Sequence, residues 1–255
     1  MIATIPDCHF TCPYAQGQVT TEQAISYQRD GWVLLPGLLS RSTAARLRAE
    51  VLEIMAAIGL PMTCLRQTGE FLPGGALHAY VHSAPLRAIA SALLAGPAHL
   101  YGPFTAVKSP GGGALHFHQD NQYTVHDGPS LNLWTALEPV DEGNGCLQIV
   151  SGSHRRGTLP AVPTAENHRG IAGTPDGVTV LRMQPGDCVA FSRLTVHGSG
   201  MNRTAVPRVA YAVQYHRQDV QATWDGNGWM PLTQRPRWTF GPVARLSVPE
   251  VASDG

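Results

Sequence analysis

Residues 131–150, LNLWTALEPVDEGNGCLQIV, contain two short apolar runs separated by a turn. The runs 131–138 and 145–150 are rich in leucine, isoleucine and valine, whereas the residues between them are mostly proline, acidic, glycine and asparagine. Short apolar runs with such boundaries predict β-strands, and Asn144-Gly145 is a hairpin turn signal. This stretch therefore favours antiparallel β-structure.

The same pattern extends in both directions, from about residue 97 to residue 216. Turn motifs such as Pro-Gly-Gly-Gly, Asp-Gly-Pro and Pro-Gly-Asp recur at near-regular intervals. We expect eight strands, at 98–108, 114–119, 131–138, 145–150, 178–183, 187–192, 195–199 and 207–216. This series predicts a mainly β fold whose core is a double-stranded β-helix of the jelly-roll, cupin-like type. The connection 152–176 is long enough to be a functional or mobile loop.

Helical patterns precede the β region. We expect helices at 21–30, closed by Gly31, from Ser40 or Ser42 to Gly59, and from Ser83 to Gly96, with a strand at 32–35. No repeat or linker interrupts the chain, so we expect a single domain over 1–255. It comprises a helical part at about 20–96, a β-helix core at about 97–216 and an irregular tail at 217–255.

The composition excludes several kinds of function. There are 18 basic and 18 acidic side chains, so no bulk charge favours nucleic acid as a partner. No apolar run reaches the roughly 18 residues of a membrane-spanning helix. The five cysteines are scattered, and the N-terminus lacks a secretory signal pattern, which predicts reduced thiols in a cytoplasmic protein. Cys8, His9 and Cys12 lack the second ligand pair of a zinc site.

Three residues at predicted strand ends could bind a metal. His118 and Asp120 lie two residues apart at the end of strand 114–119, so alternation places them on one face, and His197 stands in strand 195–199. Two imidazoles and one carboxylate form the facial triad of non-haem iron(II), although zinc hydrolases use the same donors. His116 shares the face and is the rival ligand, but its position is more typical of a packed or hydrogen-bonded histidine.

Arg208 narrows the choice of chemistry. It follows His197 by eleven residues, on the strand that returns from the hairpin 199–207, where antiparallel pairing could bring it to the same pocket. Its guanidinium would be a bidentate clamp for a carboxylate held away from the metal. Alone, Arg208 is more simply a solvated arginine at a strand start; together with the triad, the clamp is favoured. Lys108 is expected to be a surface or strand-edge cation.

Several motifs together resemble the phytanoyl-CoA dioxygenase family of iron(II)- and 2-oxoglutarate-dependent oxygenases, over about residues 20–216. The motifs are GWVLLPGLL at 31–39, HQD at 118–120, LWTAL at 133–137, NGCL at 144–147, SGSH at 151–154, HGS at 197–199 and Arg208. Within them, Ser153 and His154 are expected to close a loop rather than touch substrate.

The resemblance implies a set of roles. It implies that His118, Asp120 and His197 bind Fe(II), and that Arg208, helped by Ser199, binds the distal carboxylate of the cosubstrate 2-oxoglutarate. It also implies a contact from Trp134 to the cosubstrate, dioxygen as the second cosubstrate, and the double-stranded β-helix fold. The chain is similar to relatives that oxidise small organic metabolites such as natural-product intermediates.

Hydroxylation is the expected outcome, with desaturation, epimerisation and ring closure as further possibilities. Halogenation is disfavoured, because halogenating relatives replace the carboxylate that Asp120 supplies. The alternatives are an acyl-CoA hydroxylase, a cupin-like metal isomerase or hydrolase without 2-oxoglutarate, and a catalytically silent binding protein. Gln119 and Tyr123 could face the substrate, which we expect to be enclosed by segments 61–78 and 152–176 and by the tail with Trp224 and Trp229.

Overall fold

The structure is a computed structural model that describes residues 18–57, 64–67, 75–164, 169–223 and 228–234. The expectations for Cys8, His9 and Cys12, for most of segment 61–78 and for Trp224 fall outside the described residues.

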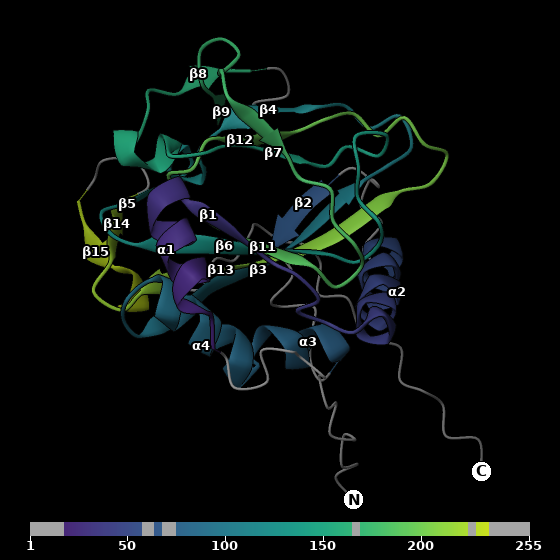
Figure 1. The fold of residues 1–255 in the computed structure, drawn as a ribbon, viewed down its shortest axis with the longest axis horizontal. Coiled ribbons are helices and arrows are strands. Elements are labelled where there is room, and N and C mark those ends of the chain that lie inside the picture. Colours follow the sequence, from purple (N-terminus) through teal and green to yellow (C-terminus); the bar gives the residue numbers. More distant parts are fainter. Residues whose placement is uncertain (1–17, 58–63, 68–74, 165–168, 224–227, 235–255) are drawn as a thin grey trace, which may run out of the picture.

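Two facing antiparallel sheets form the β core. The larger has six strands in the order β1 (Trp32–Leu35), β11 (Cys188–Ser192), β6 (Ser130–Ala136), β13 (Arg208–Arg217), β3 (Ala98–Lys108) and β2 (Cys64–Gln67). The smaller has four, in the order β10 (Val178–Val180), β7 (Leu147–Val150), β12 (His197–Ser199) and β4 (Leu115–His118). Figure 1 shows the smaller sheet lying above the larger. From β3 to β13 the chain passes back and forth between the two sheets, with β7 and β10 paired in the smaller one, and this is the double-stranded β-helix that the strand spacing predicts.

This alternation corrects two expectations about hairpins. The turn at Asn144-Gly145 does not join paired strands, because β6 belongs to the larger sheet and β7 to the smaller. Nor does β12 pair with β13; β12 pairs with β4 and β7, and β13 with β3 and β6. Arg208 therefore reaches the interior because the two sheets stack, not through antiparallel pairing with the strand of His197. Turn residues predict a change of direction, whereas the choice of partner strand depends on which faces are buried.

The helices cover the other face of the larger sheet. They are α1 (Thr21–Asp30), α2 (Arg41–Ala57), α3 (Ala76–Val81) and α4 (Ala84–Leu93), with α3 and α4 below the sheet in Figure 1. Alternate residues of β6 divide between two cores: Leu133 packs with the helices, whereas Trp134 packs between the sheets. The space for a site inside the β-helix therefore lies on the face of the larger sheet turned away from the helices.

Short elements complete the described chain. They are a sheet of β15 (Met230–Pro231), β14 (Gln221–Thr223) and β5 (Val125–His126), a ribbon of β8 (Val162–Pro163) and β9 (Arg169–Gly170), and the turns η1 (Asp120–Gln122), η2 (Ser153–Arg156) and η4 (Leu232–Gln234). The tail is thus more regular than expected, since β14 and β15 lie within it. No helix among the described residues has both the length and the apolar character needed to cross a membrane.

Candidate metal centre

His118, Asp120 and His197 meet at one end of the β core. His118 ends β4, Asp120 begins η1, and His197 begins β12, where it pairs directly with His118. The Oδ1 atom of Asp120 lies 3.8 Å from Nε2 of His118 and 3.7 Å from Nε2 of His197. One ligand atom from each residue lies within 4.8 Å of the others. This spacing suits a single ion, because metal–nitrogen and metal–oxygen bonds are near 2 Å.

Backbone carbonyls orient both imidazoles. Nδ1 of His118 is 2.8 Å from the carbonyl oxygen of His116, and Nδ1 of His197 is 2.9 Å from that of Thr195. A carbonyl can only accept a hydrogen bond, so each Nδ1 carries the hydrogen and each Nε2 directs its lone pair toward Asp120. This is the tautomer that a metal ligand requires. The donor set and its orientation therefore fit a first-row metal ion.

An amide network fixes the orientation of the Asp120 carboxylate. Gln214 Nε2 donates to Oδ2 of Asp120 at 2.9 Å, with a longer contact of 3.5 Å from Asn132 Nδ2, so Oδ1 is the atom that faces the histidines. Arg193 in turn donates to Gln214 Oε1 at 3.0 Å and to the backbone carbonyl of Asp120 at 2.8 Å. Burial is the largest influence on the pKa of Asp120 and acts to raise it, but His197, Arg193, His118 and the hydrogen bond from Asn132 together outweigh burial, and the pKa is lowered. The carboxylate is ionised and ready to bind a cation.

The local sequence pattern gives only a partial indication of this network. Gln214 and Arg208 are both even-numbered residues of one predicted strand, so alternation places them on the same face. This alternation is the sequence feature that indicates an interior position for Gln214. Arg193 lies just beyond β11, and nothing in the local sequence connects it with Asp120.

The rival ligand His116 is not part of the cluster. Its side chain is exposed, whereas we expected it to be packed or hydrogen-bonded. The reason is that β4 is the edge strand of the smaller sheet, where a side chain can turn toward solvent. Only its backbone carbonyl contributes, as the partner of His118.

Arg208 begins β13, six residues before Gln214, which contacts Asp120. The side chain is only 5% exposed, and its guanidinium lies over the ring of Trp134, 5.3 Å from the ring centre. Burial lowers the pKa of Arg208 to about 10. Its buried Nε has no hydrogen-bond partner, and no ion pair of the described residues includes it. A buried cation of this kind is costly unless an anion pairs with it, so Arg208 fits a carboxylate ligand.

Lys108 corrects an expectation, because it is neither on the surface nor at a free strand edge. It lies on β3 directly opposite Arg208 and is 4% exposed. Its Nζ donates to Ser199 Oγ at 2.8 Å and also to the carbonyl oxygen of Gly200. Ser199, Lys108 and Arg208 therefore belong to one buried polar region.

The side chains that flank the metal residues differ in role. Gln119 is buried and connects the strand end to the following loops: its amide nitrogen donates to Gly157 and Leu194, and its oxygen accepts from Leu159. It is therefore committed to the scaffold and does not face a substrate. Tyr123 is 38% exposed, with its ring edge-on to His118 at 5.9 Å, and remains available to a substrate.

The SGSH segment closes a loop, as expected. Ser153 Oγ donates to the carbonyl of Val150 and accepts from the amide of Val196. His154 Nε2 is 3.2 Å from the carbonyl of Gln28. These contacts attach the loop after β7 to β12 and α1.

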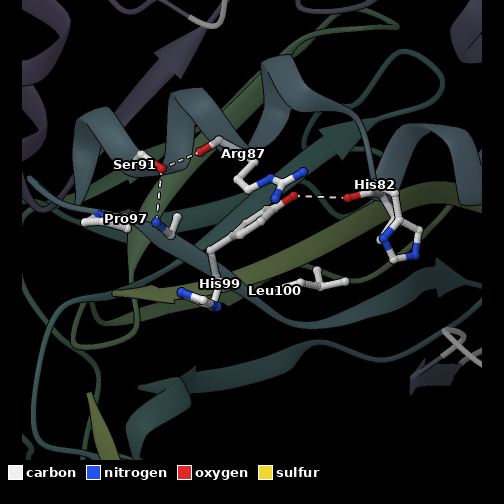
Figure 2. Close-up of a pocket in the computed structure, with 9 residues that line it drawn as sticks. His82, Arg87, Ser91, Pro97, His99 and Leu100 are labelled. Atoms are coloured by element: carbon white, nitrogen blue, oxygen red, sulfur yellow. Dashed lines mark hydrogen bonds between the residues drawn. The ribbon is translucent and has the colours of Figure 1, made fainter. Parts of the chain in front are cut away.

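A separate cavity lies on the helix side of the larger sheet (Figure 2). It has a volume of about 350 Å³ and is bounded by α4 and by the ends of β3 and β13, with Arg87, His99 and Tyr215 among its lining residues. None of the candidate ligands lines it. The sheet separates this cavity from the metal centre.

Comparison with known proteins supports a family assignment. The sequence profile of the phytanoyl-CoA dioxygenase family matches residues 27–210, well over half of the chain. A probable phytanoyl-CoA dioxygenase of Caenorhabditis elegans is 35% identical over 44% of this chain, and the match spans 41% of that protein's own length. A methylphosphonate hydroxylase of Gimesia maris is 29% identical over 78% of this chain and 81% of its own.

Solved structures share the fold. The α-ketoglutarate-dependent carbocyclase SnoK of nogalamycin biosynthesis has a TM-score of 0.69 at 23% identity, covering 80% of this chain and 86% of its own. The epimerase SnoN of the same biosynthesis has a TM-score of 0.66 at 22% identity, covering 82% and 91%. At such identities the likeness concerns the fold alone. It is the profile match, which includes the HQD and HGS motifs and ends at β13, that decides the assignment. The chain belongs to the phytanoyl-CoA dioxygenase family.

Proposed function

We propose that this protein is an iron(II)- and 2-oxoglutarate-dependent oxygenase that oxidises a small organic metabolite, in the simplest case by hydroxylation. One observation carries the proposal: the cluster of His118, Asp120 and His197 shares an interior with a buried, unpaired Arg208. The two features supply a metal site and a carboxylate site in the same β-helix. A metal hydrolase or isomerase would need only the metal site.

The metal donors suit iron(II). Two imidazole nitrogens and one carboxylate oxygen would occupy one face of an octahedral ion and leave the opposite face for a 2-oxo acid and dioxygen. A metal ion held there would supply redox chemistry that couples the conversion of 2-oxoglutarate and dioxygen into succinate and carbon dioxide to the insertion of one oxygen atom into the substrate. Gln214 and Arg193 would hold Asp120 in the ligating orientation throughout.

The distal carboxylate of 2-oxoglutarate would bind Arg208. A guanidinium offers two parallel N–H donors to a carboxylate, and in a buried site such a charge-assisted pair is strong. Trp134 lies under the guanidinium and restricts its position. Ser199 would donate its hydroxyl hydrogen to the same carboxylate.

The substrate would enter beside Tyr123. The β8–β9 ribbon lies against β4 at this point: the amide of Ile171 donates to the carbonyl of Phe117 at 2.8 Å, and Arg169 donates to the carbonyl of Gln122. The ribbon thus flanks the metal residues within the long 152–176 connection. We infer that β8, β9 and Tyr123 enclose a small metabolite and exclude water from the centre.

The test is succinate formation by protein purified without oxygen and reloaded with Fe(II). We expect 2-oxoglutarate turnover to increase with small phosphonates or with polycyclic natural-product intermediates, and acyl-CoA thioesters are assayed beside them. His118→Ala and His197→Ala should abolish turnover, whereas His116→Ala should retain it. Stimulation by acyl-CoA alone would instead indicate an acyl-CoA hydroxylase. Product formation that needs metal but not 2-oxoglutarate would contradict the proposal.

A further inference from the structure

A second buried cation lies beside Arg208. Lys108 ends β3 and pairs in register with Arg208 at the start of β13. Alternation places both side chains on the interior face, with Ala106 and Ala210 of the core between the sheets. Both are almost fully buried, at 4% and 5% exposure. The interior therefore presents two cations, not one, and Lys108 contacts Ser199 at the end of β12, the strand that begins with His197.

We propose that Lys108 is a second cation for the distal carboxylate of 2-oxoglutarate, and that it orients the Ser199 hydroxyl toward the same carboxylate. The proposal rests on the proposed function and adds a binding residue to it. We call Lys108, Ser199 and Arg208 the carboxylate pocket.

The hydrogen bonds of Lys108 set the direction of the Ser199 hydroxyl. Because Nζ of Lys108 donates to Ser199 Oγ at 2.8 Å, the oxygen is an acceptor in this contact, and its own hydrogen remains for another acceptor. A second N–H of Lys108 is used by the carbonyl of Gly200. An ammonium has three N–H groups, so one remains. The pocket can thus offer a carboxylate donors from all three of its residues.

The charges around the pocket also favour an anion. No ion pair formed by the described residues includes Lys108 or Arg208, and Glu138, which raises the pKa of Arg208, is already hydrogen-bonded by Arg48 and by the amide of Val209. Two buried positive charges repel each other, and one bound carboxylate would offset the charge of both.

Protonation of Lys108 should be coupled to binding. Burial, followed by repulsion from Arg208, lowers the pKa of Lys108 to about 7, against a smaller opposite effect from the Cys146 thiol. These are the titratable groups that act on it, from β13 and from the segment before β7. A bound carboxylate favours the ammonium form. Above pH 7 the unliganded pocket has lost this proton, so binding must take one up and becomes weaker as the pH rises.

The test uses protein loaded anaerobically with Fe(II), titrated with 2-oxoglutarate by calorimetry between pH 6 and 9. For the wild type we expect Kd to increase above about pH 7, with proton uptake revealed by buffers of different ionisation enthalpy. Lys108→Met keeps an unbranched side chain and should weaken binding at pH 6 about tenfold or more, without proton uptake. Arg203→Met, which removes an exposed cation in the β12–β13 connection, is the matched control and should bind like the wild type.

Two further measurements separate a role of Lys108 in carboxylate binding from a role in folding. Lys108→Arg stays protonated, so its affinity should not change with pH in this range; this result would hold even if Lys108→Met failed to fold. A 2-oxo acid without a second carboxylate should bind equally to wild type and Lys108→Met. Wild-type affinity and wild-type proton uptake in Lys108→Met would overturn the proposal. Failure of the proposed function would look different, because the wild type itself would then not bind 2-oxoglutarate.

Discussion

Gln214 determines which oxygen of Asp120 faces the two histidines, because its amide occupies the other oxygen at 2.9 Å. We predict that Gln214→Leu weakens metal binding about ten- to a hundredfold, the usual effect of removing a partner that orients a ligand. Metal titration followed by calorimetry measures this directly. Gln218→Leu, at an exposed position of the same region, is the control. Unchanged metal affinity in Gln214→Leu would mean that the strands alone position Asp120.

Arg208 should affect the binding of 2-oxoglutarate and leave the binding of the metal unchanged. We predict that Arg208→Ala weakens 2-oxoglutarate binding about ten- to a hundredfold, since it removes a charge-assisted bidentate contact. Arg208→Lys should restore only part of the affinity, because an ammonium cannot reproduce the planar pair of donors. The metal Kd should be that of the wild type in both variants. A loss of metal affinity equal to the loss of cosubstrate affinity would argue for a structural role.

At the scale of residues, sequence spacing predicts the candidate metal ligands and Arg208, but it does not predict the side chains that surround them. His118, Asp120, His197 and Arg208 stand out because their side-chain chemistry is specific and they lie at predicted strand ends. The burial of Lys108 could not be predicted in this way, because a lone lysine at a strand end is usually solvated. Gln119 was considered for substrate contact, but its three hydrogen bonds to distant loops show a scaffold role.

At the scale of elements, the close approach of β12 to β4 holds the two histidines together. A Cβ atom on Gly198 would lie 2.8 Å from the carbonyl oxygen of Leu115, which is backbone and cannot rotate away. We predict that Gly198→Ala separates the strands, lowers the free energy of unfolding by about 1 to 3 kcal/mol and weakens metal binding.

Denaturant titration and metal titration of the same samples test this prediction. Gly113→Ala is the matched control, because a Cβ at Gly113 would meet nothing within 4 Å. If Gly198→Ala unfolded like the wild type and bound metal equally well, the spacing of β12 and β4 would not limit the site.

The elements differ in how well the sequence predicts them. The strand at 98–108 and the helix at 21–30 were predicted with the bounds that the structure has, because apolar patterns and turn residues mark both ends. The strands β2, β5, β8, β9, β14 and β15 and the helix α3 are not predicted. The strands have two to four residues each, and so short a strand depends on its neighbours rather than on local propensity.

At the scale of the molecule, the helices decide where chemistry can occur. They cover one face of the larger sheet, where Leu133, Val209 and Tyr211 are fully buried, and leave the other face for the metal residues and the carboxylate pocket. The fold class can be predicted because short apolar runs recur between turn motifs, which is typical of antiparallel sandwiches and barrels. The path between the sheets cannot be predicted in the same way, because the turns at 144–145 and 199–207 have the composition of ordinary hairpins.

The metal centre joins distant parts of the chain, so metal binding should stabilise the whole fold. His118 and Asp120 lie almost 80 residues before His197, on different elements, and these donors come together only in the native state. A ligand present at about 100 times its Kd, and bound only by the native state, stabilises it by about 2.7 kcal/mol. For a chain of this size that corresponds to a rise in Tm of about 5 to 10 °C. Thermal unfolding with and without Fe(II) under anaerobic conditions measures the rise. His197→Ala should unfold at the same temperature in both conditions, and His116→Ala should keep the full rise. An equal rise in His197→Ala would place the bound metal somewhere other than this centre.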